Sequence, residues 1–451
     1  MGKLFGTDGV RGIVGEEISC ELAMNIGIAT ACVLKRHYKK QLNILIGRDT
    51  RISGYMLESA FLAGACSAGA NCYLTGVIPT PAISLLVCKY KFEAGVIVSA
   101  SHNPSQFNGI KIFNRFGLKL SDEVENEIEE FIFALNNKNF KYVDGVFGRQ
   151  YFAKNAVSDY VEYIASTVED VNLSGVKVAV DCANGSACAT AFSLFKKLKV
   201  DATIFNSSPD GFNINRDCGS THIEKFAEKV KRGSFDFGVA FDGDADRCLA
   251  VDENGNLIDG DQLIAIFARC MKDDGLLKNN TVVVTVMSNL GFFHFAKDNG
   301  INLEVTQVGD RYVIKNMIEK GYKIGGEQSG HIIFKDYANT GDGQLTAVQL
   351  IKYVKNSKTN FNKLANLMRK FPQVLVNVKV NNEQKQRYFN SREIENYIQT
   401  TEKFLGDESR IIVRPSGTEP IIRVMIEGPN KDLIEKTSKE VANRIYELVR
   451  T

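Results

Sequence analysis

The sequence has no excess of charge of one sign and no long apolar run. Among its 451 residues, Lys and Arg number 55 and Asp and Glu number 53, which leaves a formal charge of only +2. This balance argues against a nucleic acid or a membrane as a partner. No apolar stretch approaches the ~18 residues of a membrane span, and the start, residues 1–7, lacks the apolar core of a signal peptide. We therefore expect a soluble, cytoplasmic protein.

Paired cysteine motifs are also missing. The ten cysteines form no C-x-x-C pair, and none lies beyond Cys270. Most of them lie in apolar stretches, which is typical of small buried side chains in a reducing compartment. We expect neither a disulfide framework nor a zinc site.

Three carboxylates alternate in one short segment: Asp242, Asp244 and Asp246 follow the largely apolar stretch 235–241. Like charges this close repel one another, and a hard cation with oxygen ligands, such as Mg²⁺, would neutralise them. The next residue, Arg247, suggests an anion such as a phosphate beside the metal. A solvated acidic turn is the alternative. An EF-hand loop is excluded because Arg247 occupies the position where that loop needs glycine.

The chain shows a weak internal repetition. Three apolar, β-rich runs end in polar turns and precede helix-like sequence, at residues 44–49, 178–185 and 282–289. Each segment later repeats the order strand, polar loop, strand, at residues 95–113, 237–251 and 322–334. These patterns predict three related α/β sandwich domains, each of which offers one polar loop at the same end of its sheet. The three loops could meet in a central cleft.

The last stretch has a different design. Strand-like sequence at 373–380 and 411–426 precedes an amphipathic helix from about residue 431, which predicts a C-terminal α+β domain. We predict four domains in all, at residues 1–155, 156–256, 257–368 and 369–451. The Asn-rich patches near 136–140 and 381–390 are predicted to be surface loops.

Four further loops offer reactive or binding groups. The loop 99–104 contains Ser101 beside His102; it lacks the G-x-S-x-G pattern of a hydrolase, so it is either a plain turn or the place of a phosphoserine that would complete the aspartate site. The glycine-rich loop 6–12 presents Arg11, and residues 326–331 place polar groups around small residues; either could be a simple turn. The loop 414–420 has the arginine, hydroxyls and glycine that hold a phosphate.

Taken together and in this order, the loops resemble those of the α-D-phosphohexomutase superfamily. The matching motifs are GTDGVRG, SASHNP with NGIK, DGDADR, GEQSGH and RPSGTEP, with further agreement at VGDRYV and TGDG, and they span residues 4–428. The resemblance implies four domains around a central cleft, as expected above.

The resemblance also implies roles for individual residues. Ser101 would carry the transferred phosphate, and a phosphoserine oxygen would join Asp242, Asp244 and Asp246 in holding one Mg²⁺. The groups around the transferring phosphoryl group would be Arg247, His102 and Lys111. Candidates for proton transfer or charge balance would be Lys111, Arg11 and His331, in no fixed order. The sugar 3- and 4-hydroxyls would be held by Glu327 and Ser329. The phosphate that does not react would be held by Arg414, Ser416, Gly417 and Thr418.

The implied reaction interconverts glucosamine 6-phosphate and glucosamine 1-phosphate through a sugar 1,6-bisphosphate, on the way to UDP-N-acetylglucosamine. Gln328 within GEQSGH favours the glucosamine branch. The partner would be a small phosphosugar, with a homodimer left open. Three alternatives remain at this point: a glucose or mannose phosphate mutase, an inactive phosphosugar sensor, and a Mg²⁺-dependent phosphatase.

Overall fold

The computed structural model describes residues 4–6, 8–135, 145–416 and 420–450. The chain divides into two compact units: residues 1–287 with 301–367, and residues 288–300 with 368–451. Three sheets belong to the first unit and one to the second. In the described ranges, no helix combines the length and the apolar character needed to cross a membrane. The predicted domain boundaries stay a prediction.

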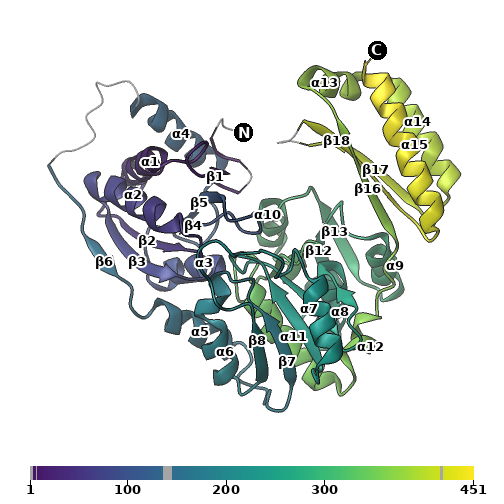
Figure 1. Cartoon of the computed structure of the whole chain (residues 1–451), viewed down its shortest axis with the longest axis horizontal. Helices are drawn as coiled ribbons and strands as arrows, with labels where there is room; N and C mark the ends of the chain where they lie inside the picture. Colours follow the sequence, from purple (N-terminus) through teal and green to yellow (C-terminus); the bar gives the residue numbers. More distant parts are fainter. Residues whose placement is uncertain (1–3, 7, 136–144, 417–419, 451) are drawn as a thin grey trace. The chain divides into compact units, whose positions relative to one another are not determined.

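The first sheet has six strands in the order β1-β5-β4-β2-β3-β6. Its strands are β1 (Val10–Ile13), β2 (Asn43–Arg48), β3 (Asn71–Val77), β4 (Ala94–Val98), β5 (Phe107–Asn114) and β6 (Gln150–Phe152). Its helices are α1 (Cys20–Tyr38), α2 (Gly54–Ser67), α3 (Thr80–Lys89) and α4 (Asp122–Leu135). Figure 1 shows α1, α2 and α4 together, and they share one core with the sheet. Because side chains alternate along a strand, Ile110 and Ile112 enter this core and Lys111 points to the other face.

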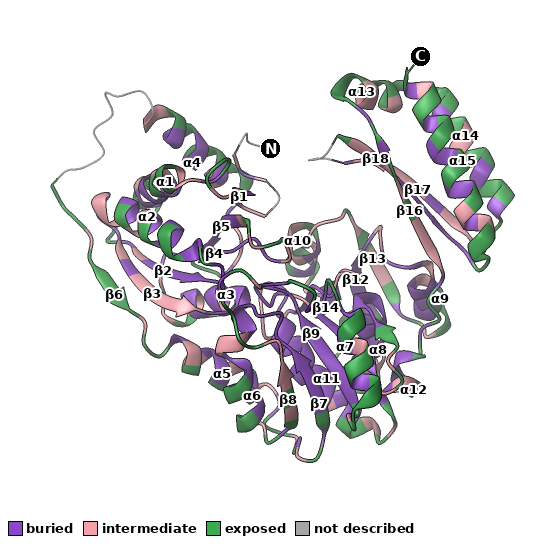
Figure 2. Cartoon of the chain, in the orientation of Figure 1, coloured by how far each residue is buried: buried purple, intermediate pink, exposed green. Residues whose placement is uncertain are grey.

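The second sheet has the order β11-β10-β9-β7-β8, and the third has the order β13-β12-β14-β15. The second contains β7 (Lys177–Asp181), β8 (Asp201–Phe205), β9 (Phe237–Phe241), β10 (Cys248–Asp252) and β11 (Leu257–Ile258), with helices α5 (Ala156–Ser166), α6 (Ala191–Lys197) and α7 (Glu224–Arg232). The third contains β12 (Thr281–Thr285), β13 (Asn302–Thr306), β14 (Ile324–Gly326) and β15 (Ile332–Phe334), with α8 (Gly260–Asp273), α10 (Asp310–Lys320), α11 (Gly343–Ser357) and α12 (Phe361–Ala365) nearby. Strand β9 and most of α11 are buried (Figure 2).

The predicted repetition is confirmed in all three sheets. A central parallel strand, β2, β7 or β12, is followed later by an antiparallel pair, which is β4–β5, β9–β10 or β14–β15. In each sheet, the polar loop predicted within residues 95–113, 237–251 or 322–334 connects the two strands of this pair. The repeated α/β architecture therefore fixes where the three loops begin and end.

The second unit is built on a three-stranded antiparallel sheet in the order β16-β18-β17. Its elements are α9 (Leu290–Asp298), β16 (Gln373–Lys379), α13 (Asn382–Asn390), α14 (Arg392–Leu405), β17 (Arg410–Pro415), β18 (Ile421–Glu427) and α15 (Lys431–Arg450). The predicted α+β module and its last helix are confirmed. The predicted loop at 381–390 is wrong, because Asn381 and Gln384 form a capping box that starts α13. The patch at 136–140 lies outside the described residues.

Candidate active site

Ser101 lies in the loop between β4 and β5. Its side chain is buried, and its Oγ donates a hydrogen bond to Asp242 Oδ2 at 2.6 Å. Its backbone has φ of +51°, in the left-handed region that residues with a Cβ rarely adopt. The structure thus joins the predicted serine loop to the predicted aspartate loop, 141 residues away in the sequence.

The three aspartates lie in the loop between β9 and β10. All are buried, and one ligand oxygen from each lies within 4.8 Å of those of the other two. Burial raises the pKa of Asp242 well above its usual range, and the neighbouring Asp246 and Asp244 raise it further. The loop is therefore not the exposed acidic turn considered as an alternative.

The donor set of this loop fits a hard divalent cation. Asp244 Oδ1 and Asp246 Oδ1 are both buried, and neither accepts a hydrogen bond from any described residue. Buried carboxylate oxygens without donors are costly unless a cation satisfies them. Mg²⁺ prefers oxygen ligands and is bound through a small number of carboxylates. Asp242, Asp244 and Asp246 are thus the residues that would hold it.

Lys111 is the cation in closest contact with the triad. Its Nζ lies 2.9 Å from Asp244 Oδ2, 3.7 Å from Asp246 and 3.1 Å from Asp8. Burial alone would lower the pKa of Lys111, but Asp244, Asp8 and Asp246 together raise it well above the usual range. Lys111 is therefore held in its charged form. Thr80 Oγ1 also donates to Asp244, at 2.7 Å.

His102 and Arg247 face each other beside the triad. Arg247 Nη1 and His102 Nδ1 are 3.2 Å apart, and the Arg247 backbone N–H donates to Asp242 Oδ1 at 3.2 Å. Burial, and next the charge of Arg247, lower the pKa of His102 to about 4. The imidazole is thus neutral near pH 7, and Arg247 supplies the positive charge of the pair.

The third predicted loop joins β14 to β15 and packs against the second sheet. The backbone N–H of Cys248, at the start of β10, donates to the carbonyl of Gly330 at 3.0 Å. Gly330 has φ of +90°, and a Cβ there would lie 2.4 Å from the Cys248 carbonyl oxygen. Glycine is therefore required where this loop approaches β10.

The predicted sugar-binding side chains occupy this third loop. Glu327 Oε1 accepts a hydrogen bond from Gly309 N at 2.9 Å. Ser329 Oγ is buried and has no hydrogen-bond partner among the described residues. His331 is buried, accepts from Gly341 N at 3.2 Å and lies 3.7 Å from Asp310. One carboxylate oxygen and one hydroxyl therefore have capacity for further hydrogen bonds.

Three charged residues that the sequence analysis did not single out connect these loops. Lys119 lies 2.5 Å from Asp8 and 2.7 Å from Asp310, so positive and negative groups alternate from the third loop to Lys111. Arg11, the predicted candidate, pairs with Asp8 as well. Asp8 and Asp310 were within motifs quoted above, GTDGVRG and VGDRYV, whereas no motif marked Lys119. The available signal for Asp8 was its place in the same motif, three residues before Arg11.

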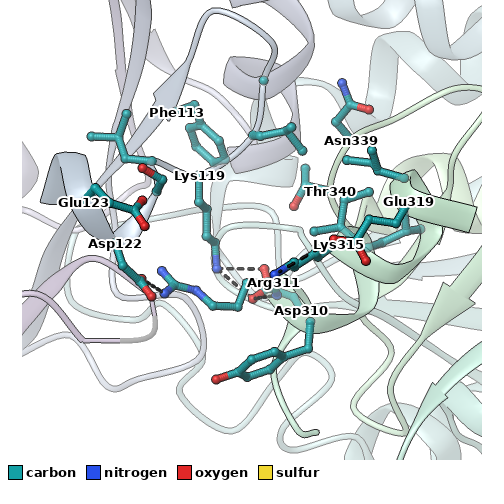
Figure 3. Close-up of a pocket in the computed structure, with 18 residues that line it drawn as sticks. Phe113, Lys119, Asp122, Glu123, Asp310, Arg311, Lys315, Glu319, Asn339 and Thr340 are labelled. Atoms are coloured by element: carbon teal, nitrogen blue, oxygen red, sulfur yellow. Dashed lines mark hydrogen bonds and ion pairs between the residues drawn. The ribbon is translucent and has the colours of Figure 1, made fainter. Parts of the chain in front are cut away.

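A cavity of about 460 Å³ lies beside this chain of charges, between residues 113–123 and residues 310–340. Figure 3 shows Lys119 directed to Asp310, and Arg311 directed to Asp122, across one side of it. Neither Ser101 nor an aspartate of the triad lines the cavity. It borders the site without containing the reactive groups.

The predicted phosphate clamp belongs to the second unit. Arg414 lies in β17, and Ser416 follows that strand and is buried. Ser416 N donates to Ile421 O at 2.9 Å, and Lys385 Nζ donates to the Ser416 carbonyl at 2.7 Å. Gly417 and Thr418 lie outside the described residues.

The chain matches four domain families of known proteins in consecutive order. They are the phosphoglucomutase/phosphomannomutase alpha/beta/alpha domains I (residues 2–139), II (158–255) and III (259–371) and the C-terminal domain (375–444). Full-length relatives include the phosphoglucosamine mutases of Caldicellulosiruptor saccharolyticus, 51% identical over 99% of both chains, and of Clostridium botulinum, 50% identical over 100% of both.

Solved structures agree on the fold. A phosphoglucomutase/phosphomannomutase family protein from Burkholderia thailandensis aligns with a TM-score of 0.82 and 21% identity, over 99% of this chain and 97% of that one. The Aspergillus fumigatus N-acetylphosphoglucosamine mutase, in complex with GlcNAc-6P and magnesium, aligns with a TM-score of 0.70 and 17% identity, over 99% and 96%.

The four domain matches and the full-length mutases, together with a buried serine hydrogen-bonded to one aspartate of a carboxylate triad, define the class: an intramolecular phosphotransferase. Within that class the four consecutive matches and the full-length relatives decide the family. The chain belongs to the phosphoglucomutase/phosphomannomutase family.

Proposed function

We propose that this protein interconverts glucosamine 6-phosphate and glucosamine 1-phosphate, and so supplies UDP-N-acetylglucosamine synthesis. The observation that carries the chemistry is the 2.6 Å hydrogen bond between Ser101 Oγ and Asp242 inside the buried triad. The choice of sugar rests on full-length relatives, at about half identity, that are named phosphoglucosamine mutases.

In the proposed cycle Ser101 carries a phosphoryl group. A sugar hydroxyl oxygen bonds to that phosphorus while the bond to Ser101 Oγ breaks, which gives a 1,6-bisphosphate. The intermediate turns over and returns its other phosphoryl group to Ser101. Each transfer takes one proton from the attacking hydroxyl and gives one to the leaving oxygen. Lys111, Arg11 and His331 are the candidates for proton transfer or charge balance in this exchange, and the positive charge of Lys111 suits charge balance.

The residues of the site divide the remaining tasks. Mg²⁺, held by Asp242, Asp244, Asp246 and a phosphoserine oxygen, would supply neutralisation of the transferring group. Arg247 and Lys111 bring further positive charge, with the neutral His102 beside Arg247. Such fixed charges are the main source of rate enhancement in phosphoryl transfer.

The other loops would bind the sugar hydroxyls and the phosphate that does not react. Glu327 and Ser329 would bind the 3- and 4-hydroxyls, for which their free hydrogen-bonding capacity is suited. Arg414, Ser416, Gly417 and Thr418 would hold the phosphate that does not react. Because the bisphosphate turns over between the two transfers, these residues must be able to hold either of its phosphates. We also propose that the protein works in the cytoplasm, where phosphosugars are made, and as a homodimer, which light scattering would check.

The test compares turnover of glucosamine, glucose and mannose 1-phosphates with Mg²⁺ and a sugar 1,6-bisphosphate activator. We expect glucosamine 1-phosphate to have the highest kcat/KM. A preference for glucose or mannose by more than about tenfold, equal to ~1.4 kcal/mol in transition-state binding, would reject the substrate. Release of inorganic phosphate in place of isomerisation would indicate a phosphatase, and binding without turnover a sensor.

A further inference from the structure

A buried arginine donates hydrogen bonds to backbone carbonyls of the serine loop, which is the loop between β4 and β5 that contains Ser101. The Arg51 side chain is fully buried. Its Nη2 donates to the carbonyl oxygens of Ser101 at 2.9 Å and Asn103 at 2.8 Å, and its Nη1 donates to that of Pro104 at 2.6 Å. Asp49 balances the charge, 2.9 Å from Arg51 Nε. One guanidinium group therefore fixes three carbonyls of the loop.

A second side chain, from the second sheet's loops, binds two of the same carbonyls. Asn215 is buried, and its Nδ2 donates to Ser101 O at 2.9 Å and Asn103 O at 3.2 Å. The Ser101 carbonyl thus receives hydrogen bonds from Arg51 and from Asn215, which are 164 residues apart in a chain of 451. A simple turn between two strands does not require two such side chains on one carbonyl.

The backbone of Ser101 is the part of the loop that needs restraint. Its φ of +51° is disfavoured for a residue with a Cβ, by roughly 1–2 kcal/mol. Ser99 Oγ accepts from Ser101 N at 3.0 Å and itself donates to Asp49 at 2.6 Å. The amide and the carbonyl of Ser101 are therefore both held by one hydrogen-bond network, which runs through Ser99, Asp49 and Arg51.

The same carbonyl also meets the aspartate loop. A Cβ on Gly243 would lie 2.6 Å from Ser101 O and 2.8 Å from Asn215 Nδ2, so only glycine allows this approach. Gly243 stands between Asp242 and Asp244 in the sequence. The two side chains consequently fix the serine loop at the point where it touches the metal-binding loop.

We propose that Arg51 and Asn215 form a carbonyl clamp that sets the position of the Ser101 phosphoryl group relative to the aspartate triad. They are positioning residues, because both act through the backbone of Ser101. This inference rests on the proposed function, in which Ser101 carries the phosphoryl group. Displacement of reacting groups by ~1 Å costs about 10²-fold in rate, so a loosened clamp acts on transfer more than on sugar binding.

The test uses Arg51→Lys and Asn215→Ala in the full chain. Lysine keeps the charge but not the planar fork that reaches three carbonyls. The matched controls are Arg48→Lys, a buried arginine that pairs with Glu58 at 3.2 Å, and Asn206→Ala, another asparagine with positive φ. Neither control residue hydrogen-bonds to the serine loop in the structure. Thermal unfolding of all four variants separates loss of stability from loss of positioning.

We expect both clamp variants to lower kcat by about 10- to 100-fold, with KM for the sugar phosphate within about threefold of the unmodified protein. The Mg²⁺ concentration for half-maximal rate should rise, and the phosphoserine ³¹P resonance should shift. The double variant should lose less than the product of the two single effects, because both act on one carbonyl.

The proposal is overturned if the clamp variants match their controls in kcat, Mg²⁺ dependence and ³¹P shift. Should Arg51→Lys not fold, Asn215→Ala alone decides, because it leaves the Arg51–Asp49 pair intact. The measurements use whichever hexose phosphate the unmodified protein turns over. An unmodified protein without any mutase turnover would reject the proposed function, whereas an active protein with unaffected variants would reject only the clamp.

Discussion

Lys111 Nζ lies 2.9 Å from Asp244 Oδ2, and both side chains are buried. The pair connects a strand of the first sheet to the aspartate loop of the second. Asp8 shares the same ammonium group at 3.1 Å. The ammonium group of Lys111 therefore compensates the buried carboxylate of Asp244 and also contacts Asp8, which pairs with Lys119 and Arg11 as well.

Replacement of Lys111 by methionine should lower the free energy of unfolding by about 3–5 kcal/mol, the usual cost of breaking a buried pair. Mutase activity should fall by at least about 10²-fold, because a cation beside the transferring group is lost. Urea unfolding and steady-state kinetics measure the two effects. The control Lys89→Met breaks an exposed pair with Asp159 and should cost about 1 kcal/mol or less. Equal losses in the two variants would contradict the role of Lys111.

Ser101→Ala should remove the covalent phosphate, which intact-protein mass spectrometry detects, and lower kcat by at least about 10³-fold, since no other hydroxyl replaces the nucleophile. Ser105→Ala makes the same change in the same loop and should keep both the phosphate and the rate. Wild-type turnover in Ser101→Ala would show that the phosphoryl group does not pass through this serine.

Chelation of divalent cations should abolish turnover, and added Mg²⁺ should restore it. Asp246→Asn should raise the Mg²⁺ concentration for half-maximal rate by at least about tenfold, because a charged ligand becomes neutral. Calorimetric titration with Mg²⁺ gives the affinity independently of activity. Asp252→Asn is the matched change, since Asp252 is also buried, at the far end of β10, but accepts hydrogen bonds from Asn256 and Asn362. Similar Mg²⁺ affinities in both variants would reject the triad as the metal site.

Asp342 should make the protein less stable as the pH rises. Burial raises the pKa of Asp342 from 3.8 to about 6, even though Leu345 N and Tyr160 donate to it. The folded state therefore binds more protons than the unfolded state between these values, so stability falls as the pH rises from about 4 to above 6. The difference in pKa corresponds to about 3 kcal/mol.

Asp342→Asn keeps the acceptor that caps α11 and removes the charge. Relative to the unmodified protein, this variant should become more stable by up to about 3 kcal/mol between pH 4 and pH 7.5. Urea unfolding at several pH values measures the difference. A stability difference that does not change with pH would mean that Asp342 titrates alike in the folded and unfolded chain.

The sequence predicted the fold well wherever the pattern of apolar residues along the chain is regular. Apolar, β-rich runs such as 178–181 and 237–241 predict buried strands. The polar loops between paired strands were predicted from where these runs end. The patch 381–390 failed because its asparagines suggested a loop, whereas the reciprocal hydrogen bonds of Asn381 and Gln384 start a helix.

The site was predictable as far as its reactive groups stand in dense motifs. The aspartate loop and Ser101 were found because three like charges and a Ser-His pair are unusual in sequence. Lys119 and Arg51 were not, since each is one cation among many and gains its meaning from carbonyls or carboxylates far along the chain. Contacts of that kind exist only after folding.

Helix α9 belongs to the second unit although residues of the first unit precede and follow it. Asn289 exchanges hydrogen bonds with Phe371, accepting from its N–H at 2.9 Å and donating to its carbonyl at 3.0 Å, and Arg410 donates to Ser288 O at 2.6 Å. No single cut can therefore separate the two units by genetic truncation. A fragment that begins at residue 368 would lack α9, and the complementary fragment would retain an α9 stripped of these partners.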